Sequence, residues 1–419
     1  MIKKLFVLIS ITAILLLCIF SSSAESTDFN LMGTETYIEN ENTKIIDHVV
    51  YRLCDYGNET HYDVYDWFDT VEAANTVEEI NIVSEIDGIK VKGIQCWLCY
   101  DSENSTLNHR YWQNHNYSVK KVFIPDTVTN IGDAFFSALD GVEELQIPAS
   151  VKKSSDRCFM GMESLKEVTF LGDVNYLSGF SDCLKLEKVC IIGSVTLISG
   201  VSFENCTSLK SFKVLGSIGG EIHGTTGGIG KAFKNCTSLE EFVFPKEADN
   251  FKIYRSAFEG CTSLKSITFP EKCGELTIGE DVFRGCTSLK TVTLPENCDS
   301  ITIGYRAFRD CENLTTVNNT DNITKIYGGA FRDCTSLKSF TISDKTTMIG
   351  KNAFYGCKNL KNVTVNSNTK APKLYANAFA KTNSALTFTA KNATAAKNWK
   401  TALTKSGLKT AKVGYMHYV

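Results

Sequence analysis

One motif recurs along most of this 419-residue chain. In its clearest copies a phenylalanine stands three residues before a cysteine and six before a leucine, as in Phe283, Cys286 and Leu289. Successive phenylalanines are 21 to 30 residues apart. This period predicts a solenoid, in which each repeat is one coil that buries its apolar side chains against its neighbours. The anchoring positions are Phe136, Phe159, Phe180, Phe203, Phe233, Phe258, Phe283, Phe308, Phe331, Phe354 and Phe379.

Each repeat predicts a short strand and a turn. After the leucine, apolar residues alternate, as in Leu239, Phe242 and Phe244, which is typical of a strand with one buried face. The Phe, Cys and Leu positions, three residues apart, favour one helical or 3₁₀ turn that faces inward. Stacked copies would add their strands into a parallel sheet at about 4.8 Å per coil.

The repeated sequence resembles a known family. Ile278-Gly279-x-x-Val282-Phe283-x-x-Cys286-x-x-Leu289-x-x-Val292-x-Leu294-Pro295 is similar to the Treponema-type leucine-rich repeats of BspA-like surface proteins. The resemblance covers roughly residues 77–390, with a degenerate first copy whose turn is replaced by an insertion at residues 95–117. It implies a leucine-rich-repeat solenoid of the α/β horseshoe type, with about 11–12 repeats of 21–30 residues. It also implies a binding scaffold outside the cell, with adhesion or protein binding as the role proposed for several members.

The start of the chain predicts secretion. Lys3 and Lys4 precede an apolar run over residues 5–20, and small residues follow up to Ala24, so we expect a signal peptide over residues 1–24. A lipid anchor on Cys18 is an alternative, although the usual small residue before such a cysteine is missing. No apolar run reaches the length needed to span a membrane.

Both ends of the repeat region should be capped, because a solenoid otherwise exposes its core. Within residues 25–76 we expect a hairpin cap, with strands over 48–54 and 60–68. Within residues 391–419, a basic cap, apolar residues at helical spacing predict a helix over 393–405 and then a strand through Val413.

Fifteen cysteines remain after Cys18. Cys273 and Cys298 lie one repeat apart in loops and are candidates for a disulfide. The sequence leaves undecided whether two of Cys54, Cys96 and Cys99 form a disulfide in the N-terminal cap. Eight others hold one repeat position, where a ladder of buried free thiols is favoured over cross-linked neighbours. These are Cys183, Cys206, Cys236, Cys261, Cys286, Cys311, Cys334 and Cys357.

The sequence offers little for catalysis or metal binding. Six histidines are scattered over the chain, and the only one in the regular repeats, His223, lies in a glycine-rich bulge over residues 219–228. His61 stands near Asp63, Asp66 and Asp69, but the spacing is not that of a calcium loop and favours a solvated hairpin face. Cys96 and Cys99 have no second pair that would complete a zinc site. We therefore predict no catalytic, metal or cofactor site.

Two regions are candidates for ligand binding. Residues two and four positions after each repeat leucine should point outward on the concave face of the sheet. The candidates there are Ser266, Thr268, Thr291, Thr293, Thr316, Ser339, Thr341 and Thr364. Threonine is also a good strand former, so solvation explains this row equally well. The insertion carries a second candidate set, for which packing over the cap is the alternative: His109, Tyr111, Trp112, His115 and Tyr117.

Charge is unevenly distributed. The net charge of −3 argues against nucleic-acid binding. Residues 25–87 hold 16 acidic and 2 basic residues, whereas residues 345–419 hold 13 lysines and no acid. Our main hypothesis is a secreted, monomeric scaffold that binds an extracellular protein or another macromolecule. The alternative is an envelope component that its lysine-rich end retains on anionic cell-wall polymer.

Overall fold

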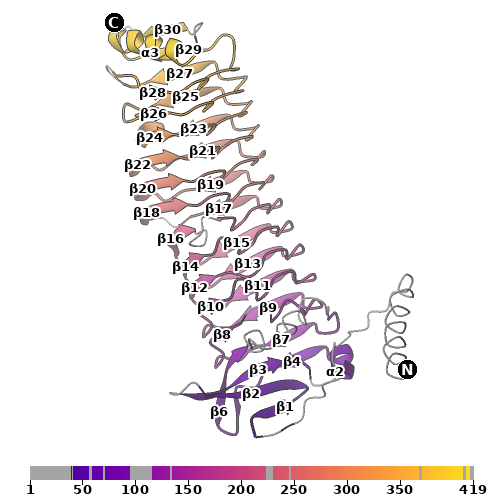
Figure 1. The fold of residues 1–419 in the computed structure, drawn as a ribbon. Helices are drawn as coiled ribbons and strands as arrows, with labels where there is room; N and C mark the ends of the chain where they lie inside the picture. Colours follow the sequence, from indigo (N-terminus) through magenta and orange to yellow (C-terminus); the bar gives the residue numbers. More distant parts are fainter. Residues whose placement is uncertain are drawn as a thin grey trace, which may run out of the picture.

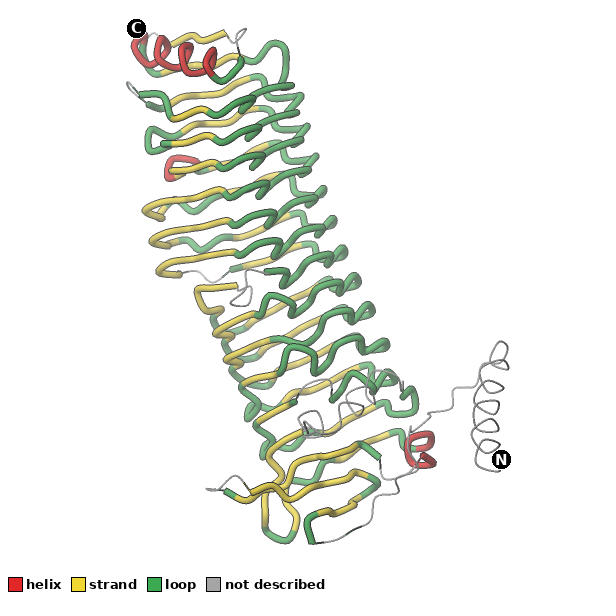
Figure 2. The backbone as a smooth tube through the Cα atoms, in the orientation of Figure 1, coloured by secondary structure: helices red, strands yellow, loops and turns green. Residues whose placement is uncertain are grey.

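The chain winds into an elongated solenoid in a computed structural model (Figure 1). The structure describes residues 39, 41–55, 59–68, 71–94, 116–132, 135–222, 230–244, 247–367, 370–408 and 412–415. Strands occupy two sides of the coils and loops connect them, with little helix (Figure 2). The expected signal peptide and Cys18 lie outside the described residues.

Each typical coil contributes two strands, where the sequence pattern predicted one. Around Phe283, strand β20 (Lys272–Ile278) comes before the phenylalanine and β21 (Thr291–Thr293) follows Leu289. In β20 the apolar Leu276 and Ile278 are buried while Glu275 and Thr277 beside them are less so, which is the alternation of a strand with one face on the core. The expectation of a single sheet was therefore incomplete.

The strands that precede the phenylalanines form one continuous sheet of 16 strands, parallel apart from β1, β2 and the hairpin strand β5. It consists of β1 (Thr43–Ile46), β2 (Val49–Asp55), β3 (Thr60–Asp66), β5 (Glu85–Ile86), β6 (Ile89–Ile94), β8 (Asn130–Ile131), β10 (Lys153–Ser154), β12 (Val174–Leu177), β14 (Val195–Ile198), β16 (Ile218–Ile222), β18 (Glu247–Ile253), β20, β22 (Asn297–Ile303), β24 (Ile323–Ile326), β26 (Met348–Ile349) and β28 (Lys373–Leu374).

The strands that follow the repeat leucines form a second row, split among the described residues into five shorter parallel sheets. We call the solvent side of this row the second-row face. Its strands are β4 (Glu79–Asn81), β7 (Lys121–Phe123), β9 (Glu144–Ile147), β11 (Glu167–Phe170), β13 (Lys188–Ile191), β15 (Ser211–Val214), β17 (Glu241–Val243), β19 (Ser266–Thr268), β21, β23 (Thr316–Asn318), β25 (Ser339–Ile342), β27 (Asn362–Val365), β29 (Thr387–Ala390) and β30 (Lys412–Tyr415).

Between the two rows, the Phe, Cys and Leu positions form tight turns. The amide of Cys286 donates to the carbonyl of Phe283, and that of Leu289 to Cys286, both at 3.2 Å. Backbone bonds that span three residues in this way are typical of 3₁₀ turns. Only η3 (Thr320–Asn322) among the described residues is long enough to be a 3₁₀ helix. The Phe258, Phe283 and Phe308 rings stack across coils, with centroids 5.5 and 5.2 Å apart. The core is thus a column of rings along the axis.

Backbone geometry explains two recurring residue types. The second residue after every anchoring phenylalanine except Phe136 adopts a left-handed conformation, as at Asn235 (φ 60°), Gly285 (φ 73°) and Asp333 (φ 59°). Glycine, asparagine and aspartate tolerate this conformation best. The glycine of the Ile-Gly pair has another cause. A Cβ on Gly304 would lie 2.6 Å from the backbone of Gly279, because neighbouring coils approach closely there.

Both ends of the long sheet carry additional elements. At the N-terminal end, β2 and β3 pair antiparallel and β3 joins β6, with α2 (Val71–Thr76) beside them. At the other end, helix α3 (Ala393–Lys405) begins at Asn392, whose side chain accepts from the Ala395 amide, and buries Trp399 and Leu403. Strand β30, which extends to Tyr415 rather than ending at Val413, pairs parallel with β29.

Candidate binding surface

The hydroxyl-rich row lies on the second-row face. In β21, Thr291 and Thr293 are exposed while Val292 between them is buried, and β19 repeats the pattern. Ser339 is exposed, and Thr316, Thr341 and Thr364 are partly exposed at the equivalent positions. The eight residues therefore share one side of five neighbouring strands. They carry no charge and no large apolar side chain that could anchor a partner.

The N-terminal half of the same face is chemically different. The equivalent outward positions hold Lys121 and Phe123 in β7, Glu144 and Gln146 in β9, and Lys188 in β13. The outward positions predicted as a binding surface lie only in the later repeats, so the prediction missed this half. Applying the same register to the degenerate first copy would have identified Phe123.

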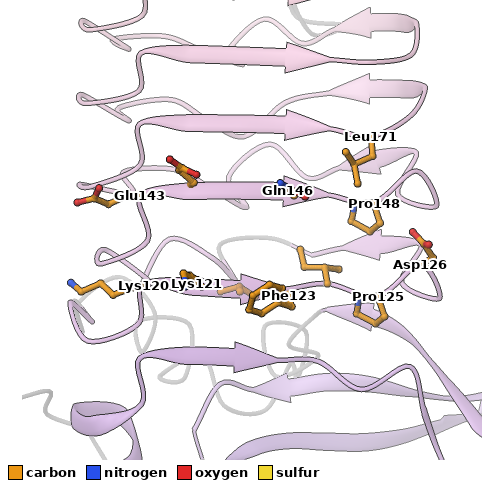
Figure 3. A pocket seen from close by; sticks show the side chains of 12 residues that line it. Lys120, Lys121, Phe123, Pro125, Asp126, Glu143, Gln146, Pro148 and Leu171 are labelled. Carbon is orange, nitrogen blue, oxygen red and sulfur yellow. The ribbon is translucent and has the colours of Figure 1, made fainter.

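A groove of about 790 Å³ lies over β7 and β9 (Figure 3). Phe123, which is 52% exposed, lies beside Pro125, Pro148 and Leu171 at the more apolar end, where Asp126 is the charged residue. Lys120, Lys121 and Glu143 line the other end. An exposed phenylalanine within a cluster of apolar residues is typical of an anchor point in a protein interface.

The apolar end of the groove continues along the solenoid. Leu171, Ile192 and Leu215 each follow the last residue of a second-row strand, and these last residues are in register across β11, β13 and β15. Their exposed fractions are 41%, 47% and 68%. We call these three residues the apolar row. The buried prolines Pro270 and Pro295 hold the corresponding position in later repeats, so the apolar row is confined to the N-terminal half.

Charges beside the groove are paired between coils. The ammonium of Lys166 lies 2.7 Å from the Glu143 carboxylate, and Lys210 lies 2.8 Å from Glu187. The bonds to these lysines hold the pKa values of Glu143 and Glu187 below their ordinary value. Such exposed pairs stabilise the fold little, but they cancel the local charge. Among the described residues of this region, the exposed apolar side chains are therefore the main groups that still lack a complementary contact.

The structure describes one of the five candidate residues in the insertion. Tyr117 is 42% exposed, and its hydroxyl donates to Glu163 at 2.7 Å, which raises the pKa of Tyr117 to about 12. His109, Tyr111, Trp112 and His115 lie outside the described residues.

The cysteines fall into two groups. Cys273 and Cys298 form a disulfide between β20 and β22, with their Cα atoms 4.6 Å apart. The eight ladder cysteines are buried free thiols. Each thiol donates to the carbonyl of the phenylalanine one coil earlier, as Cys286 does to Phe258 at 3.2 Å. Cys96 and Cys99 lie outside the described residues.

Within the described residues, few side chains are grouped in a way that could support catalysis or metal binding. His61 Nε2 lies 3.3 Å from Asp63 Oδ1, and the Cys54 thiol lies 3.5 Å from the other oxygen of this buried carboxylate. Asp66 accepts from the Trp67 amide. Within the described ranges no three His, Cys, Asp or Glu side chains are grouped to hold a metal ion. His223 and Asp69 lie outside those ranges. No helix in the described part of the chain is long and apolar enough to span a membrane.

The two rows of parallel strands and the stacked core define a leucine-rich-repeat β-solenoid. The family described as "BspA type Leucine rich repeat region" matches residues 106–220, 229–301 and 252–387, in six copies. These segments cover more than half of the chain, which therefore belongs to this family.

The chain is also similar to solved structures, all at low sequence identity. A leucine-rich repeat protein from Bacteroides ovatus is 19% identical, with a TM-score of 0.52, over 89% of this chain and all of its own. A leucine rich cell surface protein from Faecalibacterium prausnitzii is 16% identical, with a TM-score of 0.36, over 91% of this chain and 96% of its own. A leucine-rich repeat protein of T. pallidum is 17% identical, with a TM-score of 0.27, over 69% of this chain and 88% of its own. No curated protein matches the chain significantly.

Proposed function

We propose that this chain is a secreted or surface-exposed scaffold that binds a partner protein without catalysis. The groove with the exposed Phe123, continued by the apolar row, is the observation that carries this proposal. Burial of these side chains by a partner would supply the hydrophobic contribution at the centre of an interface, with the paired charges forming its polar rim. Secretion is supported by Lys3, Lys4 and the apolar run that follows them.

The partner should present an apolar segment that lies along the solenoid axis. Leu171, Ile192 and Leu215 repeat once per coil in one line, so a strand, helix or extended segment running across the coils can contact all three. The hydroxyl row of the C-terminal half would lie beyond this contact and contribute solvation or weak polar contacts.

Binding to a panel of purified extracellular matrix proteins and mucins, at low and high salt, tests the proposal. The Leu171→Glu variant and the Phe123→Ala variant are compared with Thr293→Ala, a change at another exposed position, in the hydroxyl row. We expect salt-resistant binding to a panel member that both groove variants weaken and the threonine variant preserves. Loss of binding in Ser266→Glu and Thr291→Glu, with Leu171→Glu unaffected, would move the contact to the hydroxyl row. Absence of any salt-resistant binding across the panel would contradict a protein-binding role.

A further inference from the structure

Lysine and glutamate alternate along one line of the solenoid, and this alternation stops before its C-terminal end. The line passes through the residue just before each second-row strand, where backbone bonds link successive coils. At this position Lys265 pairs with Glu240 at 2.8 Å. The following coils hold Lys290, Thr315, Lys338 and Lys361, without an acid.

Lys338 and Lys361 therefore place two exposed ammonium groups on adjacent coils. The Lys361 amide donates to the Lys338 carbonyl at 3.0 Å, so their side chains leave the backbone about one strand spacing apart. This separation is shorter than the screening length of about 8 Å at physiological salt, and the two positive potentials add. Like charges at such positions oppose folding slightly, so the stability of the isolated chain does not explain the arrangement.

The uncompensated charge extends over several elements at the C-terminal end of the solenoid. Lys351 lies in the turn before Phe354, Lys373 in β28, and Lys397 and Lys400 on α3, and all four are exposed. These elements cluster at the C-terminal end in Figure 1. Residues 345–419 contain no Asp or Glu, and no described lysine among them lies within ion-pair distance of a carboxylate. A planar membrane could touch only one side of this end, whereas a flexible polymer could follow several.

The type of cation indicates the ligand chemistry. All 13 basic residues in 345–419 are lysines. The arginines lie earlier in the chain, and several of them pair with carboxylates, as with Arg306 to Asp281 at 2.7 Å and Arg332 to Asp333 at 3.1 Å. Guanidinium groups suit planar, bidentate recognition, whereas ammonium groups act as point charges that donate to phosphate oxygens from many directions.

We propose that the lysine-rich C-terminal end binds a flexible, linear polyanion whose charges are phosphate groups. Binding would proceed by release of the counterions that the polymer carries in solution, and would weaken as salt increases. This site is separate from the groove around Phe123 and does not depend on a protein partner.

The test measures the affinity of the purified protein for fluorescently labelled inorganic polyphosphate over a series of NaCl concentrations. The site variant K338Q/K361Q/K397Q/K400Q removes four unpaired lysines and leaves Lys405, which favourably faces the C-terminal end of the α3 dipole. The control variant K166Q/K188Q/K210Q/K265Q removes four lysines that pair with glutamates, so both variants change the net charge equally. Vesicles of phosphatidylcholine and phosphatidylglycerol provide the membrane arm.

We expect the site variant to weaken polyphosphate binding roughly tenfold or more and to reduce the salt slope by about one for each contacting lysine. The control variant should bind as the wild type does. Equal losses in both variants would attribute binding to net charge alone and overturn the proposal, as would wild-type affinity in the site variant. Binding to the vesicles with none to polyphosphate would also overturn it. The single variant K361E separates loss of binding from loss of folding. Its new carboxylate can pair with Lys338, so we expect weaker polyphosphate binding without a lower melting temperature.

Discussion

The thiol of Cys311 donates a hydrogen bond to the carbonyl oxygen of Phe283, one coil earlier, at 3.0 Å. Both residues are fully buried. The same carbonyl accepts the amide of Cys286 within its own coil, at 3.2 Å. One backbone oxygen thus serves both the turn and the stacking of coils, and the ladder cysteines act as small hydrophobic residues that also supply a donor.

The ladder thiols should be unreactive and should make the fold sensitive to alkali. Burial raises the pKa of Cys183 to about 12 from an ordinary value of 9.0. The stabilising contribution of the buried thiol is fully present below the pKa that Cys183 has in the unfolded chain, where the folded and the unfolded chain both hold the proton. It falls as pH rises above that value, because the unfolded thiol ionises first. Between pH 8 and pH 10 we expect the free energy of unfolding, measured in urea, to decrease by on the order of 1 kcal/mol for each ladder thiol.

Two measurements check this expectation. Iodoacetamide at pH 8 followed by mass spectrometry should label the partly exposed Cys190 in the native protein and spare the ladder until urea is added. The variant C261A/C286A/C311A should show a smaller difference between pH 8 and pH 10 than the wild type. Native labelling of the ladder, or an unchanged pH effect in the variant, would contradict the assignment.

Phe258→Ala should be among the most destabilising single changes. The ring is fully buried and stacks between Phe233 and Phe283, with centroids 5.2 and 5.5 Å away, so truncation leaves a cavity in the ring column. A loss of about 3–5 kcal/mol in the free energy of unfolding is expected. Phe123→Ala is the matched control, because this ring is half-exposed and its removal should change stability by less than about 0.5 kcal/mol. Similar losses in the two variants, measured by urea unfolding, would argue against the stacked core.

Two glycines should respond differently to the same substitutions. Gly285→Ala introduces only left-handed backbone strain, since the nearest atom to a new Cβ is 4.0 Å away, and should cost about 1 kcal/mol. Gly304→Ala forces a Cβ against the Gly279 backbone at 2.6 Å and should cost more. Asparagine separates the causes. Gly285→Asn should recover part of the loss, because Asn235 occupies the equivalent site, whereas Gly304→Asn should recover none. Recovery at Gly304 would refute close approach as the reason for that glycine.

The disulfide between Cys273 and Cys298 should stabilise the middle of the solenoid. Because it closes a loop of 25 residues, its removal in C273S/C298S should lower the free energy of unfolding by about 2–4 kcal/mol. Dithiothreitol should produce a similar loss in the wild type and none in the variant. Equal stability of wild type and variant under oxidising conditions would show that the bond is absent or contributes nothing.

The repeat pattern predicted the coil, its period and the buried positions, since Phe, Cys and Leu recur at fixed spacings. It did not predict the strand before the Ile-Gly pair. There the alternation of Leu276 and Ile278 covers few residues, and only pairing with the neighbouring coils stabilises so short a strand. The groove was missed for another reason. It arises where Phe123, Pro148 and Leu171 meet, and these residues come from three repeats of unequal sequence.

Because the repeats are so similar, whole coils can be gained or lost during evolution without disturbing the fold. Phe258, Phe283 and Phe308 are each 25 residues apart, and each coil pairs only with the coils before and after it. Duplication or loss of one such unit creates no new kind of contact. It changes the distance between the Phe123 groove and the lysine-rich end by one strand spacing, about 4.8 Å. Gene-level copying of whole repeats can therefore adjust the reach of the molecule in fixed steps while leaving both surfaces intact.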